Sequence, residues 1–203
     1  GDNLSVALGI LNDPLGDPTY DGNNGKALTS QVKFDAEKFS ASAALNWGKE
    51  AGNSFVAAGS RNEYVGLLDV ILALKGHDNL EAWVNYDFRF QNDLTNGGDA
   101  DVSTKIHAIA AAARLGVTDK TGIAGRFEYV RVDTDNAPGT TAGLSTGNSY
   151  TLTGTFDHAL TENLTAKAEV RWDRTDPASL ISAAGNANKT DQVVAMAQLL
   201  YEF

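Results

Sequence analysis

The three histidines are the first side chains in this sequence that could do catalytic chemistry. His77 and His158 fall at or near short predicted turns, and His107 lies toward the other end of a predicted strand. Nucleophilic catalysis needs a nucleophile, a histidine and an acid to converge. No His-Glu-x-x-His motif or phosphate-binding glycine loop is present, and cysteine is absent. We therefore predict no catalytic residue and no enzyme.

Aspartates in the long connections are a second candidate group, because carboxylate oxygens bind calcium. Their spacing matches no known calcium-binding loop. We predict solvated, turn-forming aspartates with no metal and no cofactor, and calcium is the alternative left open. The aspartates concerned are Asp13, Asp17, Asp21, Asp99, Asp101, Asp133 and Asp135.

A third group consists of charged side chains that occupy every second position and so share one face of their strands. If the strands close into a barrel, this face points into the lumen. Opposite charges there either pair and fill a narrow barrel or line a wet pore, where their transverse field acts on charged or dipolar solutes. We expect Glu169 to form a lumenal pair with Arg171 or Arg126. The predicted pore-lining residues are Glu81, Asp87, Arg89, Arg126, Glu128, Lys167, Glu169 and Arg171.

The elements that position these side chains are strands, because the apolar residues alternate with a period of two. Between 80 and 91 one face is apolar and the opposite face is mostly polar, a separation that a helix would scatter. The alanine-rich run 108–113 favours a helix by propensity, but its neighbours favour a strand. The predicted strands are 3–12, 26–36, 38–48, 62–75, 80–91, 103–117, 121–132, 149–160, 163–173 and 191–203.

The connections alternate in length along the chain. Tight turns are predicted at 35–38, 75–79, 118–120 and 161–163. Long connections rich in Gly, Asn, Asp, Ser and Pro are predicted at 13–25, 49–61, 92–102, 133–148 and 174–190. Short turns on one side and long loops on the other are typical of bacterial outer-membrane β-barrels, whose short turns face the periplasm.

Composition excludes several other classes of protein. No run approaches the roughly 18 to 20 apolar residues that a membrane-spanning helix needs. The net charge of -10 argues against nucleic acid as a partner, because binding phosphates requires a basic face. A soluble β-sandwich is the competing all-β fold, but consecutive hairpins of near-constant length favour a closed up-and-down barrel.

Aromatic side chains are predicted to form two belts on the apolar face. Trp47, Phe90 and Trp172 fall near the long-loop ends of strands, and Phe39, Phe156, Tyr201 and Phe203 fall near the short-turn ends. A terminal phenylalanine on an amphipathic strand is typical of outer-membrane barrels, in which the last strand carries the assembly signal. We therefore expect the barrel-assembly machinery to recognise Phe203.

The sequence also resembles a known family. The segment from Leu160 to Asp173 looks like the penultimate hairpin of the OmpL-like β-barrel porins of Gram-negative bacteria, and Gly9 to Asn12, Asn46 to Gly48 and the strand start near Asp69 are similar to that family as well. The resemblance spans the chain and implies an outer-membrane pore for small solutes. Because it matches mainly the C-terminal portion of the family, it also raises the expectation that strands preceding residue 1 belong to the native barrel, so that ten is a lower bound.

We therefore expect one transmembrane, antiparallel β-barrel domain over 1–203, in the bacterial outer membrane, with lipid or lipopolysaccharide around it. The predicted function is a porin-like channel for passive diffusion of small hydrophilic solutes or ions. In a closed ten-stranded barrel, plugging by lumenal side chains is favoured, since about eight strands are already filled and about sixteen leave a channel. One alternative is a non-conducting structural or adhesion barrel that binds a partner through its long loops, and another is an outer-membrane enzyme acting through His107. The sequence does not predict an oligomeric state.

Overall fold

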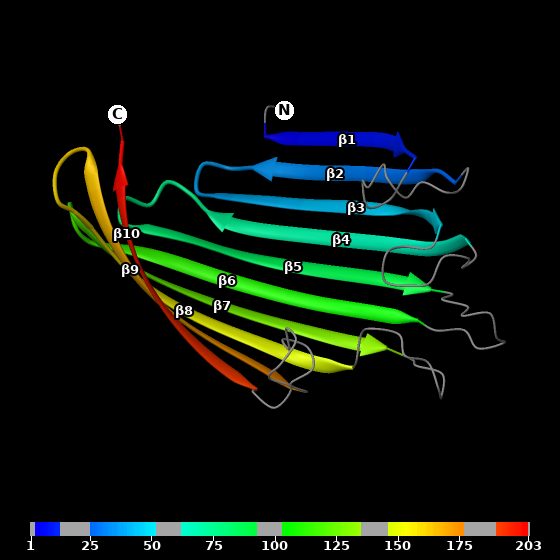
Figure 1. Ribbon diagram of the computed structural model, residues 1–203. Coiled ribbons are helices and arrows are strands. Elements are labelled where there is room, and N and C mark those ends of the chain that lie inside the picture. The colour runs from blue at the N-terminus through cyan, green and yellow to red at the C-terminus, as the bar shows by residue number, and fades with distance from the viewer. Residues whose placement is uncertain are drawn as a thin grey trace.

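The computed structural model describes residues 3–12, 25–51, 62–92, 103–134, 146–176 and 190–202. These residues form a single antiparallel sheet in which every strand pairs with its neighbours in the chain, in the order β1 to β10 (Figure 1). The strands are β1 (Leu4–Leu11), β2 (Ala27–Asp35), β3 (Phe39–Ala51), β4 (Asn62–Leu74), β5 (Leu80–Asn92), β6 (Thr104–Thr118), β7 (Thr121–Thr134), β8 (Gly147–Ala159), β9 (Leu164–Asp176) and β10 (Asp191–Tyr201).

The ten predicted strands are confirmed, with ends that differ by no more than three residues. The largest differences are at the long-loop ends, where β3 and β9 each continue three residues beyond the predicted strand. The alanine run 108–113 lies inside β6, paired with β5 and β7 along its whole length. Hydrogen bonding to two neighbouring strands thus outweighs the helix propensity of alanine, which is a weak preference by itself.

Cross-strand pairing extends each face of one strand across the whole sheet, because directly paired residues project to the same side. Tyr86 of β5 is paired with Val70 and Ile109, whereas Asp87 is paired with Asp69 and Ala108. We call the side that carries Tyr86 the apolar face and the side that carries Asp87 the polar face. The register from β1 to β10 carries both faces through all ten strands.

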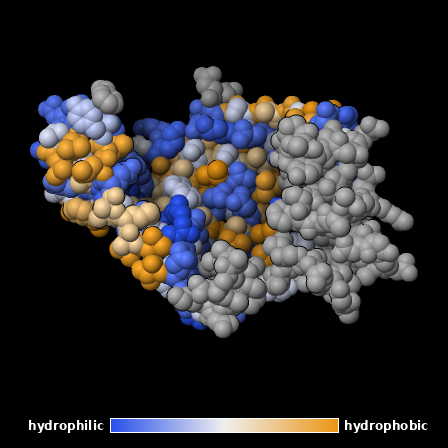
Figure 2. Space-filling view, viewed as in Figure 1, coloured by the Kyte–Doolittle hydropathy of each residue, from blue (hydrophilic) through white to orange (hydrophobic). Residues whose placement is uncertain are grey.

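Burial is inverted relative to a water-soluble protein. Within the described segments, the ten buried non-glycine residues all lie on the polar face, and seven of them are polar or charged, including Asp173 at 7% and Thr175 at 1% exposure. The apolar face is exposed, as Leu8 at 75% and Leu199 at 69% illustrate. Figure 2 shows hydrophilic residues gathered in the hollow of the sheet. An exposed apolar face of this extent requires an apolar surrounding such as lipid.

The tight turns occur where the alternation predicts them. They connect β2 to β3, β4 to β5, β6 to β7 and β8 to β9, and the Ala36 amide donates to the Phe39 carbonyl at 2.8 Å. Gly76 has a φ of 65°, a left-handed conformation that glycine adopts without steric cost. The long connections fall mostly outside the described residues, so that only their strand-proximal ends are seen.

The sheet is strongly curved but not closed, since no hydrogen-bonded ladder joins β1 to β10 (Figure 1). Within lipid each free backbone N–H and C=O would cost several kcal/mol on average, so both outer edges need pairing partners in a membrane. None of the described residues forms a helix long and apolar enough to cross a bilayer.

Candidate functional site

All eight predicted pore-lining residues lie on the polar face, but they do not form one cluster. Glu81, Asp87 and Arg89 project from β5, and the other five project from β7 and β9. Between them runs β6, whose polar face carries Ala108, Ala110 and Ala112 over this stretch. Neighbouring strands lie about 4.8 Å apart, so β5 and β7 are roughly 10 Å apart. We call the strip of the polar face formed by these three alanines the alanine track. The outcome is one charged group on β5 and a second on β7 to β9.

The group on β7 to β9 is organised in rows of paired residues across three strands. One row contains Arg126, Thr153 and Arg171, and the next row toward the long loops contains Glu128, Thr151 and Asp173. Two bases thus flank one threonine, and two acids flank the next. We call these six residues the arginine–acid ladder.

Ion pairs within the ladder form along a strand and not across strands. Arg126 Nη2 lies 3.0 Å from Glu128 Oε2, and Arg171 Nε lies 2.8 Å from Asp173 Oδ1. Residues two apart in a strand share a face, so a base-x-acid triplet creates this geometry locally. The base-x-acid spacing was a signal in the sequence that our prediction did not use.

The expected pair of Glu169 with Arg171 or Arg126 is therefore not what the described residues form. The Glu169 carboxylate instead accepts a hydrogen bond from the Thr155 hydroxyl at 3.0 Å. Thr155 is the direct partner of Glu169 in the β8–β9 register, so the short cross-strand contact takes precedence. Arg171 is already held by Asp173, which also accepts a hydrogen bond from Thr151 at 2.7 Å.

A further ion pair lies near the short-turn end, and it was not predicted from the sequence. Arg114 of β6 donates to both carboxylate oxygens of Asp157 on β8, with Nε–Oδ1 at 3.0 Å and Nη2–Oδ2 at 2.7 Å. The intervening strand β7 presents Gly122 here, and a Cβ at this position would lie 2.7 Å from Asp157 Oδ1. The missing side chain of Gly122 lets the bidentate pair cross β7.

Charges of alternating sign continue along this end of the polar face. Lys33 and Lys75 both contact Asp35, at 2.7 and 2.8 Å. Glu81 is the cross-strand partner of Arg114, and Lys167 is that of Asp157. In order from β2 to β9 the charged residues are Lys33, Asp35, Lys75, Glu81, Arg114, Asp157 and Lys167. Neighbouring members of this series carry opposite charges.

Two acids on the other side of the alanine track have no basic partner within the part of the chain that the structure describes. Asp69 of β4 and Asp87 of β5 are directly paired, and Asp69 Oδ1 accepts a hydrogen bond from Asn85 at 2.6 Å. Arg89 lies farther toward the long-loop end and donates to Gln91 at 3.5 Å. The described part of the chain contains no group of three residues that could hold a metal ion.

Among the described residues, neither His107 nor His158 is hydrogen-bonded to an acid. His107 lies on the apolar face, where its Nδ1 is 2.9 Å from the Tyr86 hydroxyl and its ring is 4.6 Å from that of Phe88. His158 lies on the same face near the short turn after β8, 2.9 Å from the Thr121 hydroxyl. The contacts of both histidines are those of membrane-facing side chains near the ends of strands. Catalysis by His107 has no support from this geometry.

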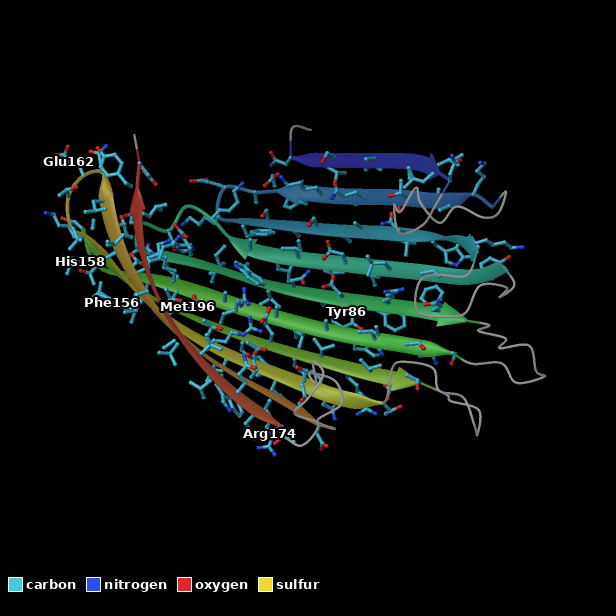
Figure 3. All side chains as sticks on the ribbon, viewed as in Figure 1. Tyr86, Phe156, His158, Glu162, Arg174 and Met196 are labelled. Carbon is cyan, nitrogen blue, oxygen red and sulfur yellow. The ribbon has the colours of Figure 1, made fainter. Side chains whose placement is uncertain are left out.

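Among the described residues, aromatic side chains of the apolar face lie near both ends of the strands, as the two predicted belts require, whereas Trp83 lies on the polar face. Trp47 and Tyr64 stack at 5.5 Å near the long-loop end, with the Lys49 ammonium 5.2 Å from the Tyr64 ring. Phe34 and Phe39 contact each other at 5.7 Å beside the short turn between β2 and β3. Tyr86 and Phe156, which Figure 3 labels, lie on the apolar face, and the same figure labels Glu162 in the short turn before β9 and Arg174 near the long-loop end of β9. Phe203 lies outside the described residues.

Comparison with known proteins gives one clear result. The family model described as "Putative beta-barrel porin-2, OmpL-like" matches residues 1–203, which is the whole chain. A search of the curated proteins finds no match.

Proposed function

Because this chain belongs to the OmpL-like β-barrel porin family, we propose that it forms the wall of a channel in the bacterial outer membrane. Small hydrophilic solutes or ions diffuse passively through this channel. The observation that carries the proposal is the inverted burial, with an exposed apolar face and a polar face that holds the buried residues. The apolar face contacts lipid or lipopolysaccharide, and the polar face contacts water and solute.

The charged residues of the polar face support a water-filled path. Arg126, Glu128 and Arg171 keep side-chain exposures of 42%, 30% and 41% despite their ion pairs. A tightly packed barrel core would exclude water from such groups. That arrangement is unfavourable, because burying a charge is costly even when it is paired. We propose that all eight predicted residues line the pore. Those on β5 lie on one side of the alanine track, and those on β7 and β9 lie on the other side.

The proposed barrel is one domain that includes all ten strands. The free edges of β1 and β10 are paired in the membrane-embedded state, either with each other or with further strands. Recognition of Phe203 by the barrel-assembly machinery belongs to the same proposal. Catalysis has no part in it.

Single-channel recording in a planar bilayer tests the channel. The refolded protein is expected to give stable, ohmic current steps, because a continuous aqueous lumen conducts in proportion to voltage. Folding is verified beforehand by the shift in gel mobility between boiled and unboiled samples. A correctly folded protein that gives no steps contradicts the channel.

A non-conducting structural barrel is the second candidate, and one observation favours it. The Arg114–Asp157 pair crosses an entire strand, which is the geometry of side chains that fill an interior. The two candidates differ in the double variant Arg114→Ala, Asp157→Ala. An open channel gains little conductance from it, whereas a barrel closed by this pair begins to conduct.

A further inference from the structure

We propose that Arg126 and Arg171 form a binding position for one small oxyanion, a carboxylate or phosphate group carried by a solute on its way through the channel. This inference rests on the proposed channel function and identifies the class of solute. It begins from the row Arg126, Thr153, Arg171, in which one short side chain separates two guanidinium groups. The backbones of β7 and β9 are about 10 Å apart, within the combined reach of two arginine side chains.

Among the described residues, the ion pair of each of these arginines uses only one nitrogen of its guanidinium group. Arg126 uses Nη2 for Glu128, and Arg171 uses Nε for Asp173. Each guanidinium has five N–H donors. The carboxylates of Glu128 and Asp173 both lie one row nearer the long loops than the two arginines. They therefore contact the arginines only from the long-loop side of the arginine row.

Two polar atoms in this row lack any partner among the described residues. These are Arg126 Nε and the hydroxyl of Thr153, which is only 6% exposed. Buried donors and acceptors are nearly always hydrogen-bonded in native proteins, and each exception calls for an explanation. An oxyanion held by the two guanidinium groups would bring an acceptor to this row, in which the Nε donor of Arg126 is unsatisfied.

The chemistry selects an oxyanion over other ligands. Guanidinium groups present planar, paired donors that match the oxygens of carboxylate and phosphate. The neighbouring acids Glu128, Asp173 and Glu169 lower the affinity by repulsion, so a bound solute leaves quickly. Weak binding of this kind is what conduction requires, because a permeating solute must enter and also leave.

The experiment measures how phosphate or acetate reduces the chloride current through single channels at constant ionic strength. We expect both anions to reduce the current of the unmodified protein. Arg171→Gln should raise the half-blocking concentration about tenfold, since a charge-assisted hydrogen bond contributes roughly 1.4 kcal/mol. Phosphate block without acetate block would identify phosphate esters as the solute class, and the reverse would identify carboxylates.

Lys33→Gln is the matched control. Lys33 is also the base of a base-x-acid triplet on the polar face, but its row contains no second base. This variant should keep the half-blocking concentration of the unmodified protein. An equal shift in both variants overturns the site, because general electrostatics then explains the block.

A binding measurement separates failure of the site from failure of the channel. Isothermal titration of the folded protein in micelles with phosphate or acetate needs no conduction. Heat of binding that disappears in Arg171→Gln and persists in Lys33→Gln supports the site even if no current is seen. Current without block and without heat of binding leaves the channel standing and overturns the oxyanion position.

Discussion

At the scale of single residues, the polar face depends on small side chains that leave room for large ones. Gly122 admits the Arg114–Asp157 pair, and Thr153 separates the two arginines of the ladder. Gly66 has the same role on the apolar face, since an added Cβ there would collide with the ring of Phe90. Thr153 and Gly66 lie directly between large neighbours on adjacent strands, whereas Gly122 is paired with Gly116 and Asp157, and Arg114 reaches over it from one row away.

Gly122→Ala tests the crossing pair. The new Cβ would lie 2.7 Å from both Arg114 Cζ and Asp157 Oδ1, so at least one of these side chains must move and the bidentate contact is weakened. We expect the free energy of unfolding to fall by about 1–3 kcal/mol, measured by urea titration in micelles. Gly125→Ala in the same strand is the control, because its Cβ would meet no atom within 4 Å. Equal stability of the two variants would contradict the structural role of the pair.

At the scale of elements, each strand contacts two different surroundings, and their difference decides which substitutions it tolerates. Val170 of β9 lies on the apolar face, 55% exposed, and Val130 of β7 lies on the polar face. The two valines have the same side chain but opposite environments. Which substitutions a position tolerates therefore depends on its face of the sheet as much as on its residue type.

Val170→Lys should lower the stability of the folded barrel in lipid vesicles by about 2–4 kcal/mol, because a lysine near the middle of the bilayer loses its hydration. Val130→Lys should cost far less, since its ammonium remains in water. Both values come from denaturant titrations in the same vesicles. A larger loss for Val130→Lys would mean that the two faces are assigned the wrong way round.

At the scale of the whole molecule, alternating short turns and long connections orient the sheet across the membrane. The short turns include Asp119–Lys120 between β6 and β7 and Leu160–Asn163 between β8 and β9. Outer-membrane barrels place such turns on the periplasmic side. All four described turns lie at the same end of the sheet, so one experiment can orient the molecule.

An epitope inserted between Asp119 and Lys120 should be inaccessible to antibody on intact cells and become accessible once the outer membrane is permeabilised. The control is the same epitope in the connection between β7 and β8, which should be detected on intact cells. Detection of the first epitope without permeabilisation would reverse the proposed orientation.

Local order was predictable from the sequence alone because it depends on a period of two. That period placed Glu81, Asp87 and Arg89 on one face of β5, and it placed Arg126 and Glu128 together on β7. The strands, their faces and the tight turns follow from this alternation and from turn-forming residues. The predicted ion pair of Glu169 with Arg171 or Arg126 was wrong because alternation does not say which of several neighbours on one face a side chain contacts: Glu169 contacts Thr155 of the adjacent strand, and Arg171 contacts Asp173.

Only the tertiary structure decided the contacts between strands. Register placed Thr155 opposite Glu169, aligned Arg126 with Arg171 across Thr153, and brought Arg114 to Asp157 over Gly122. Register arises from turn geometry and cooperative hydrogen bonding along whole strands, and a slip of one residue would move every side chain to the other face. The sequence by itself therefore determined the two faces of this sheet, and the folded structure determined which charges on the polar face meet.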